Sequence, residues 1–154
     1  MTKRRLLLWP ICLATAAILA LVATSLAGAG ATSTPIKAAW IYVGPHNDGG
    51  WSQAHDAGRL YVQRTLGNKV QTTFKENVPE GPQVAQVIES LISDGTKIIF
   101  ATSFGFQPSM VAAAKKHPDV YFEMATGTAV SKNMAEYFGA GEDATYLAGM
   151  AAGA

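Results

Sequence analysis

One stretch limits the possible folds more than any other: residues 37–51, KAAWIYVGPHNDGGW. An apolar run at 38–43 ends in a polar loop rich in glycine, and helical periodicity begins at Trp51. A buried run, a glycine loop and a helix in this order are typical of the first βα unit of an α/β domain. Because open parallel sheets bind ligands at the carboxyl ends of their strands, the loop at 44–50 is the first candidate binding site.

The rest of the chain repeats this alternation of strand and helix. Further strands are predicted at 69–76, 97–101, 120–124 and 134–138, with helices at 51–66, 82–94 and 108–116 and a last helix after Asp143. Residues 69–76 alternate between apolar and polar, which indicates a half-exposed edge strand, whereas 97–101 is continuously apolar, as in a central strand covered on both faces. The pattern predicts an α/β fold with a doubly wound parallel sheet and right-handed crossovers.

The helical segments differ in how clearly they show a buried face. Residues 82–94 give the clearest pattern, with Pro82 in the first turn and Gly95 after the end. Asp143 is predicted to cap the last helix. For the helix at 51–66, the residues that recur at helical spacing are Trp51, Ala54, Gly58, Tyr61, Val62 and Thr65.

The N-terminus has the layout of a secretory signal peptide. A basic start at 3–5 precedes a long apolar run, and small residues follow, so residues 1–31 are predicted to be a signal cleaved after Ala29 or Ala31. An uncleaved membrane anchor is the alternative, because the apolar run approaches the length of a bilayer span. The only cysteine, Cys12, lies in this run, so the remaining chain would contain no disulfide. Residues 32–36 would form a linker and 37–154 one domain.

The distribution of charge argues against nucleic acid as a partner. The whole chain carries a formal charge of +1, but three of its basic residues lie in the predicted signal, so acidic residues are in excess in the rest. A nucleic-acid-binding domain should show the opposite balance.

No motif for metal binding or catalysis is present at the spacing that such chemistry needs. Ser103 lacks a G-x-S-x-G elbow, and the loop at 44–50 matches neither a dinucleotide-binding nor a P-loop pattern. The histidines do not form a metal-ligand set; they are His46, His55 and His117. We therefore predict no metal, no cofactor and no enzyme activity. A Rossmann or flavodoxin-like enzyme or nucleotide-binding domain is the alternative, although Asp48 would repel an anion from the helix start.

Four strand-end loops are predicted to meet along one edge of the sheet: 44–50, 102–107, 126–129 and 139–142. The candidate ligand-binding residues are Asn47, Asp48, Gly49, Trp51, Ser103, Phe104, Gly105, Phe106 and Thr126. They offer hydrogen bonds, close backbone approach and an indole that can stack on a flat ring. The structural alternatives are an Asx turn that caps the helix, with Trp51 in the core, and core positions for Phe104 and Phe106. The turn at 76–81 is interpreted as a connector that could bring Glu76 or Asn77 near this edge.

Several segments, in order, resemble the BMP family of substrate-binding proteins, the purine nucleoside receptor-like group that serves ABC importers. The segments are WIYVGPHNDGGWSQAHDAGRLYV, ENVPEG, IIFATSFGFQPSM, KKHPDVYFEMATG and EYFGAGEDATYLAGMAAG, and the similarity covers about residues 37–154. The resemblance implies a periplasmic-binding-protein-like type I lobe, the N-terminal one of two, with the C-terminal lobe absent from this chain. It also implies secretion across the inner membrane, to the periplasm or the outer face of the cell membrane.

The resemblance further implies a ligand and a partner. The ligand would be a purine nucleobase or nucleoside and the partner an ABC permease, although a ligand-sensing lobe would look the same in sequence. Trp51 matches the aromatic position that stacks on the base in the family. Where nucleoside-binding members tend to carry an aspartate for the ribose, this chain has Pro108, whose side chain has no polar group. A nucleobase such as adenine therefore fits this sequence at least as well as a nucleoside.

Overall fold

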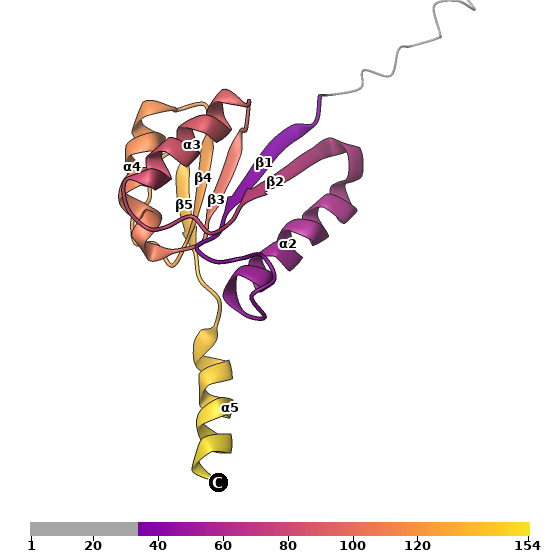
Figure 1. Ribbon diagram of the computed structural model, residues 1–154, viewed down its shortest axis with the longest axis vertical. Helices are drawn as coiled ribbons and strands as arrows, with labels where there is room; N and C mark the ends of the chain where they lie inside the picture. Colours follow the sequence, from indigo (N-terminus) through magenta and orange to yellow (C-terminus); the bar gives the residue numbers. More distant parts are fainter. Residues whose placement is uncertain (1–33) are drawn as a thin grey trace, which may run out of the picture. The chain divides into compact units, whose positions relative to one another are not determined.

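The computed structural model describes residues 34–154 (Figure 1), so the predicted signal peptide at 1–31 lies outside the described residues. The elements are β1 (Ile36–Ile41), α2 (Trp51–Leu66), β2 (Val70–Lys75), α3 (Gln83–Ser93), β3 (Ile98–Ala101), α4 (Gln107–Lys116), β4 (Tyr121–Ala125), β5 (Met134–Tyr137) and α5 (Gly141–Gly153). Two short 3-10 turns, η1 (Gly67–Lys69) and η2 (Phe104–Phe106), precede β2 and α4. These bounds agree with the predicted elements to within a few residues.

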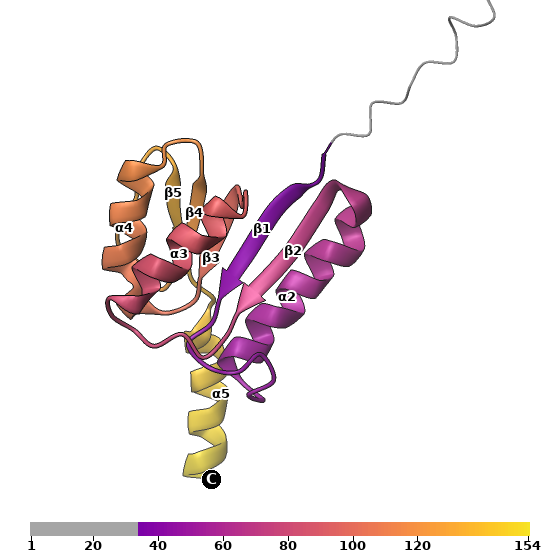
Figure 2. The same ribbon diagram turned by 45° about the horizontal axis from the view of Figure 1, so that its top comes forward.

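The strands form one parallel sheet in the order β2-β1-β3-β4-β5. The strand β2 lies at an edge and alternates between half-buried and exposed residues, as predicted, and β3 is the central strand. Helix α2 lies on one face of the sheet, and α3 and α4 lie on the other (Figures 1 and 2). The fold is therefore the predicted doubly wound α/β sheet. Its strand order reverses between β1 and β3, and ligands in such sheets bind at this switch point.

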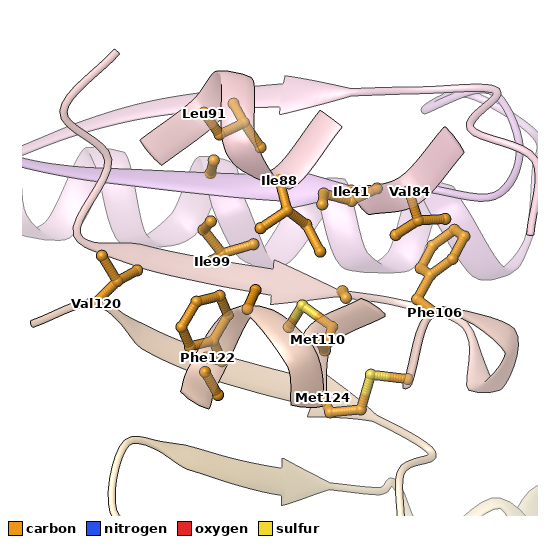
Figure 3. Packing of buried hydrophobic residues seen from close by; sticks show 14 of the residues in the cluster. Ile41, Val84, Ile88, Leu91, Ile99, Phe106, Met110, Val120, Phe122 and Met124 are labelled. Carbon is orange, nitrogen blue, oxygen red and sulfur yellow. The ribbon is translucent and has the colours of Figure 1, made fainter. Parts of the chain in front are cut away.

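The main core lies between the sheet and the helices α3 and α4 (Figure 3). Val84, Ile88 and Leu91 share one side of α3, because residues three and four apart lie on the same face of a helix. They pack with inward-facing residues of the sheet and of the η2–α4 segment, which include Ile41, Ile99, Phe106, Met110, Phe122 and Met124. Most of these side chains are fully buried, so this face supplies most of the apolar burial.

The opposite face of the sheet is covered much less completely. Its buried residues are Ala38, Trp40 and Tyr42, and the rings of Trp40 and Phe100 stack at a centroid distance of 4.3 Å. In β3, Ile99 and Ala101 are buried on the first face, whereas Ile98 and Phe100 are only half-buried on this one. The prediction that this strand is covered on both faces is therefore wrong for the described residues, because α2 alone packs on the second face.

Helix α2 turns a different side to the sheet from the one its sequence indicates. Its buried residues are Ser52, Asp56 and Arg59, while the face of the residues at helical spacing, with Trp51, Ala54, Gly58, Tyr61 and Thr65, is exposed apart from the half-buried Val62. The reason is a polar network under the helix. Asp56 Oδ1 accepts hydrogen bonds from Arg59 Nε at 2.6 Å and from the Tyr42 hydroxyl at 3.1 Å.

This network decides the charge state of its members. Burial by itself would raise the pKa of Asp56, but the hydrogen bonds from Arg59 and Tyr42 outweigh that effect and hold the pKa below its usual value. Burial next to Asp56 raises the pKa of Tyr42. The carboxylate and the guanidinium therefore form a buried ion pair within α2. The Tyr42 hydroxyl, which donates to Asp56, and the Thr72 hydroxyl, which accepts from Arg59, connect this pair to the sheet.

Helix α5 has no buried residue, although Tyr146, Leu147 and Met150 are large and apolar. It follows β5 after a three-residue link and extends beyond the carboxyl ends of the strands in Figure 1. Its N-cap is Ala140, with no side-chain hydrogen bond, so the prediction that Asp143 caps this helix is wrong. Asp143 lies in the first turn, where a carboxylate still interacts favourably with the helix dipole. Among residues 34–154, no helix combines the length and the apolar character needed to cross a bilayer.

Candidate functional site

The loops after β1 and β3 lie side by side at the switch point and are joined by hydrogen bonds. The Thr102 amide and hydroxyl both donate to the Ile41 carbonyl, at 3.1 and 3.0 Å. From the other side, Trp51 Nε1 donates to the Thr102 carbonyl at 2.6 Å. Trp51 and Ser103, which are far apart in sequence, therefore lie at the same edge, as predicted.

Asp48 organises the first of these loops. Its two carboxylate oxygens accept hydrogen bonds from the amides of Gly50, Ser52 and Gln53 at 2.9–3.0 Å. These bonds to the ionised form lower the pKa of Asp48 to about 2. The Asx-turn alternative is thus confirmed for Asp48: the carboxylate satisfies the first amides of α2. Gly49, at a φ of +71°, provides the left-handed backbone that the turn requires.

The loop after β2 is tied to the same region. The Asn77 amide donates to the Gly44 carbonyl at 3.2 Å. The Glu76 carboxylate accepts from the His46 amide at 2.8 Å and contacts His46 Nδ1 at 2.7 Å. The hydrogen bonds from the His46 amide and ring lower the pKa of Glu76. These contacts place Glu76 and Asn77 near the edge, which the sequence left open.

A third carboxylate at this edge, that of Glu80, contacts the loop after β3. Glu80 Oε1 accepts a hydrogen bond from the Ser103 hydroxyl and another from the Gly105 amide, the latter at 3.1 Å. A Cβ on Gly105 would collide with the Glu80 carboxyl group, so only glycine allows this close approach. Glu80 was not among the candidates predicted from sequence. The available signal was its position in a turn after a strand of the same sheet.

Trp51 has the exposure that a stacking residue needs. Its side chain is 44% exposed, and its ring meets His55 edge-on at a centroid distance of 4.7 Å. His55 Nδ1 lies 3.3 Å from the Tyr137 hydroxyl, and burial lowers the pKa of His55. Partial burial, together with the charge of Glu123, raises the pKa of Tyr137 to about 12. The alternative that places Trp51 in the core is not what the structure shows.

This aromatic row leads from the edge into a groove of about 480 Å³ on the thinly covered face. The groove is lined by Trp40, Ala54, His55, Gly58, Tyr61, Val62, Phe100, Glu123 and Tyr137. His55 and Tyr137 were not predicted site residues, because they face each other only after the sheet has formed.

The remaining predicted residues differ in position: Phe104 and Asn47 are exposed, Phe106 is buried, and Thr126 lines another hollow. Phe104 is 59% exposed, whereas Phe106 is fully buried in the main core. A role for Phe106 in ligand contact is therefore contradicted, because its side chain has no exposed surface at this edge. Asn47 is exposed beside Asp48. Thr126, which has a φ of +63°, lines a separate hollow of about 240 Å³ with Gly127 and residues 136–138.

Comparison with known proteins places these features in a family. Residues 36–154 match the family model Bmp, described as ABC transporter substrate-binding protein PnrA-like. A purine-binding protein of Brucella abortus is 42% identical over 127 residues, which is 82% of this chain and 36% of that protein. A Haloferax volcanii protein that is named as an ABC transporter glucose-binding protein is 36% identical over 132 residues. The match covers 86% of this chain and 33% of that protein. The chain thus spans about a third of the length of these relatives.

Solved structures support the fold. An ABC transporter solute-binding protein from Conexibacter woesei superposes with a TM-score of 0.59 at 18% sequence identity, over 67% of this chain and 35% of that one. A solute-binding protein from Aeropyrum pernix gives a TM-score of 0.57 at 20% identity, over 68% of this chain and 28% of that one. At this level of identity the likeness shows a shared fold only.

Proposed function

The chain belongs to the Bmp family of PnrA-like ABC transporter substrate-binding proteins, and from this premise we propose that its carboxyl edge captures a purine nucleobase or nucleoside for delivery to an ABC permease. Residues 37–154 act as the N-terminal lobe of a two-lobed binding protein. The protein works outside the cytoplasmic membrane, in the periplasm or at the outer face, after export by the segment at 1–31. It performs no covalent chemistry.

The observation that carries this proposal is the position of Trp51. Its indole N–H is fixed on the Thr102 carbonyl, while nearly half of its side chain is exposed at the switch point. An indole held in this way loses little conformational entropy when a flat ring stacks on it. A good aromatic pair is worth about 0.5–1.5 kcal/mol beyond the area that it buries. Phe104, exposed on the neighbouring loop, is available as a second apolar contact.

Hydrogen bonds at the same edge supply orientation. Asn47 is exposed beside the Asp48 turn and can both donate and accept. The Ser103 hydroxyl and the Gly105 amide already donate to Glu80, so the Glu80 carboxylate, with its remaining acceptor positions, forms the neighbouring wall. Each oriented hydrogen bond adds about 1 kcal/mol. One lobe covers a ligand from one side only, so we expect weak binding by this chain alone and tighter binding where a second lobe closes over the site.

The choice of a purine is supported by the name of the Brucella abortus relative, whereas the Haloferax volcanii relative is named for glucose. An indole face at the rim suits a flat heterocycle. Pro108, which provides no side-chain partner for a ribose, favours the free base adenine over adenosine.

A flavodoxin-like nucleotide-binding domain is the second candidate, because it shares this strand order and binds its cofactor at the same switch point. Such a site needs free backbone N–H groups for a phosphate. Here Asp48 already occupies the first amides of α2. The second candidate is therefore the weaker one.

Ligand-dependent thermal unfolding tests the proposal. We expect adenine, adenosine, guanosine or inosine to raise the melting temperature of the chain, because a ligand that binds only the folded state stabilises it. FMN, NAD and D-glucose are measured in parallel at the same concentrations and ionic strength. Stabilisation by FMN or NAD alone would favour the nucleotide-binding alternative. Stabilisation by glucose alone would assign the site to a sugar.

A further inference from the structure

Two carboxylates stand at the walls of the proposed site and already hold its hydrogen-bond donors. Asp48 accepts from the amides of Gly50, Ser52 and Gln53 in the loop after β1. Glu80, from the loop after β2, accepts from the Ser103 hydroxyl and the Gly105 amide in the loop after β3. Asp48 thus belongs to the loop after β1 and Glu80 contacts the loop after β3, and the Trp51 indole joins these two loops through its bond to the Thr102 carbonyl.

We propose that Asp48 and Glu80 are specificity-determining residues that keep phosphorylated ligands out of this site, so that it admits an uncharged purine base or nucleoside and rejects the corresponding nucleotide. This inference rests on the proposed function, whose ligand class it narrows.

The first reason is that the donors a phosphate would use are occupied. At the strand-to-helix turns of parallel sheets, backbone N–H groups and hydroxyls are the usual partners of a phosphate. In this chain both turns at the switch point give these donors to carboxylates of the protein itself. A phosphate must therefore displace Asp48 or Glu80, and it cannot donate a hydrogen bond in return.

The second reason is charge. A phosphate monoester carries about −1.5 to −2 charges at neutral pH. Two basic side chains of this region are already paired with other carboxylates. Arg59 is buried in its pair with Asp56, and His46 is engaged by Glu76. Repulsion between like charges a few ångströms apart near a protein surface corresponds to about a tenfold loss of affinity or more.

The same carboxylates do not penalise an uncharged purine. An ionised carboxylate accepts hydrogen bonds and donates none, so it suits a ligand with N–H or O–H donors. The exocyclic amine and ring N–H of adenine, or the hydroxyls of a nucleoside, are groups of this kind. A nucleotide adds nothing but acceptors and negative charge at its phosphate.

The test compares adenosine with adenosine monophosphate by NMR titration of the chain at constant ionic strength. The reporters are the amide resonance of Gly105 and the indole N–H resonance of Trp51. In the unaltered chain we expect the monophosphate to bind at least about tenfold more weakly than adenosine. Glu80→Gln keeps an acceptor for Ser103 and Gly105 and removes the charge. It should reduce the difference in affinity between the two ligands by about tenfold. Asp48→Asn, which also retains a capping oxygen, should narrow it in the same direction.

Matched controls remove one carboxylate elsewhere. Glu89→Gln acts between α3 and the end of α4, where Glu89 contacts Lys116 and His117. Asp119→Asn acts before β4, where Asp119 contacts Lys97. Both should leave the difference in affinity unchanged, because they alter net charge without altering the site.

Three results would overturn the inference. The first is equal affinity of the unaltered chain for adenosine and for adenosine monophosphate. The second is an affinity difference between these ligands that stays the same in both Glu80→Gln and Asp48→Asn. The third is an equal reduction of that difference in the control variants. If neither adenine nor adenosine binds, the proposed function fails separately. The inference would then stand only if the monophosphate shifts Gly105 in Glu80→Gln and not in the unaltered chain.

Discussion

The two faces of the sheet are built in different ways. On one face, α3 and α4 close over fully buried aliphatic and aromatic side chains such as Ile99 and Phe122. On the other face, α2 lies alone, and its Asp56 and Arg59 side chains are hydrogen-bonded to Tyr42 and Thr72 of the sheet. The rings of Trp40 and Phe100 stack on each other within the sheet on this face. The first face stabilises the fold. The second, which is less covered and more polar, adjoins the binding edge.

Neighbouring isoleucines of β3 give the largest expected contrast. Ile99→Ala should cost about 2–5 kcal/mol in the free energy of unfolding, because it leaves a cavity in the closed core. Ile98→Ala, the same change one residue earlier on the thinly covered face, should cost about 1–2 kcal/mol, since less apolar area is lost. Urea denaturation of the two variants measures both values. Equal costs would mean that the two faces contribute alike.

The next largest effect on the free energy of unfolding is expected from the polar network of Tyr42, Asp56 and Arg59. Arg59→Met leaves the Asp56 carboxylate buried with only the Tyr42 hydroxyl as a partner, and should destabilise the chain by about 1–3 kcal/mol. The double variant Arg59→Met with Asp56→Leu should recover part of this loss, because no unpaired charge remains. If the single variant unfolds at the same urea concentration as the unaltered chain, the network does not hold α2 in place.

Acid should weaken the cap of α2 within a definite window. The pKa of Asp48 is lowered from 3.8 to about 2 in the folded chain. The stabilisation from its ionised form is therefore complete above about pH 5 and is lost as the pH falls through about 2. Asp48→Asn removes the titrating group, so its melting temperature should fall less than that of the unaltered chain over this window. If the melting temperatures of the unaltered chain and of Asp48→Asn depend on pH in the same way, the hydrogen bonds of ionised Asp48 do not stabilise the folded chain.

The smallest effect is expected from an exposed ion pair on the closed face. Glu89 joins α3 to α4 through Lys116 and His117, but solvent reaches these groups. Glu89→Gln should leave the urea midpoint within experimental error, because exposed pairs contribute little. A clear loss of stability would show that surface contacts, and not the apolar core, hold this face together.

The sequence predicted most of the fold because apolar periodicity determines strand and helix. The spacing of Val84, Ile88 and Leu91, and the run at 97–101, were sufficient to place α3 and the centre of the sheet. The burial of α2 could not be predicted in this way. A pattern search counts apolar residues, whereas Asp56 and Arg59 are buried through hydrogen bonds to Tyr42 and Thr72 of the sheet. Ser52 is buried beside them without a side-chain hydrogen bond.

The candidate site was predictable in part for the same reason. Loops at the carboxyl ends of parallel strands must share an edge, so Asp48, Trp51 and Ser103 could be expected near one another. The role of Glu80 depends on how the loop after β2 bends toward Gly105, which the sequence does not encode locally. Phe106 follows the exposed Phe104 by two residues and is nevertheless buried, because η2 turns the two rings to opposite sides.

The central claim is that Trp51 stacks on a planar purine at the switch point. Titrating the chain with adenine while following the indole N–H resonances of Trp51 and Trp40 tests it most directly, since Trp40 is a buried indole in the same chain. We predict a saturable shift of the Trp51 resonance, none for Trp40, and loss of adenine binding in Trp51→Ala. An unmoved Trp51 resonance at saturating adenine, or unchanged binding by Trp51→Ala, would contradict the account.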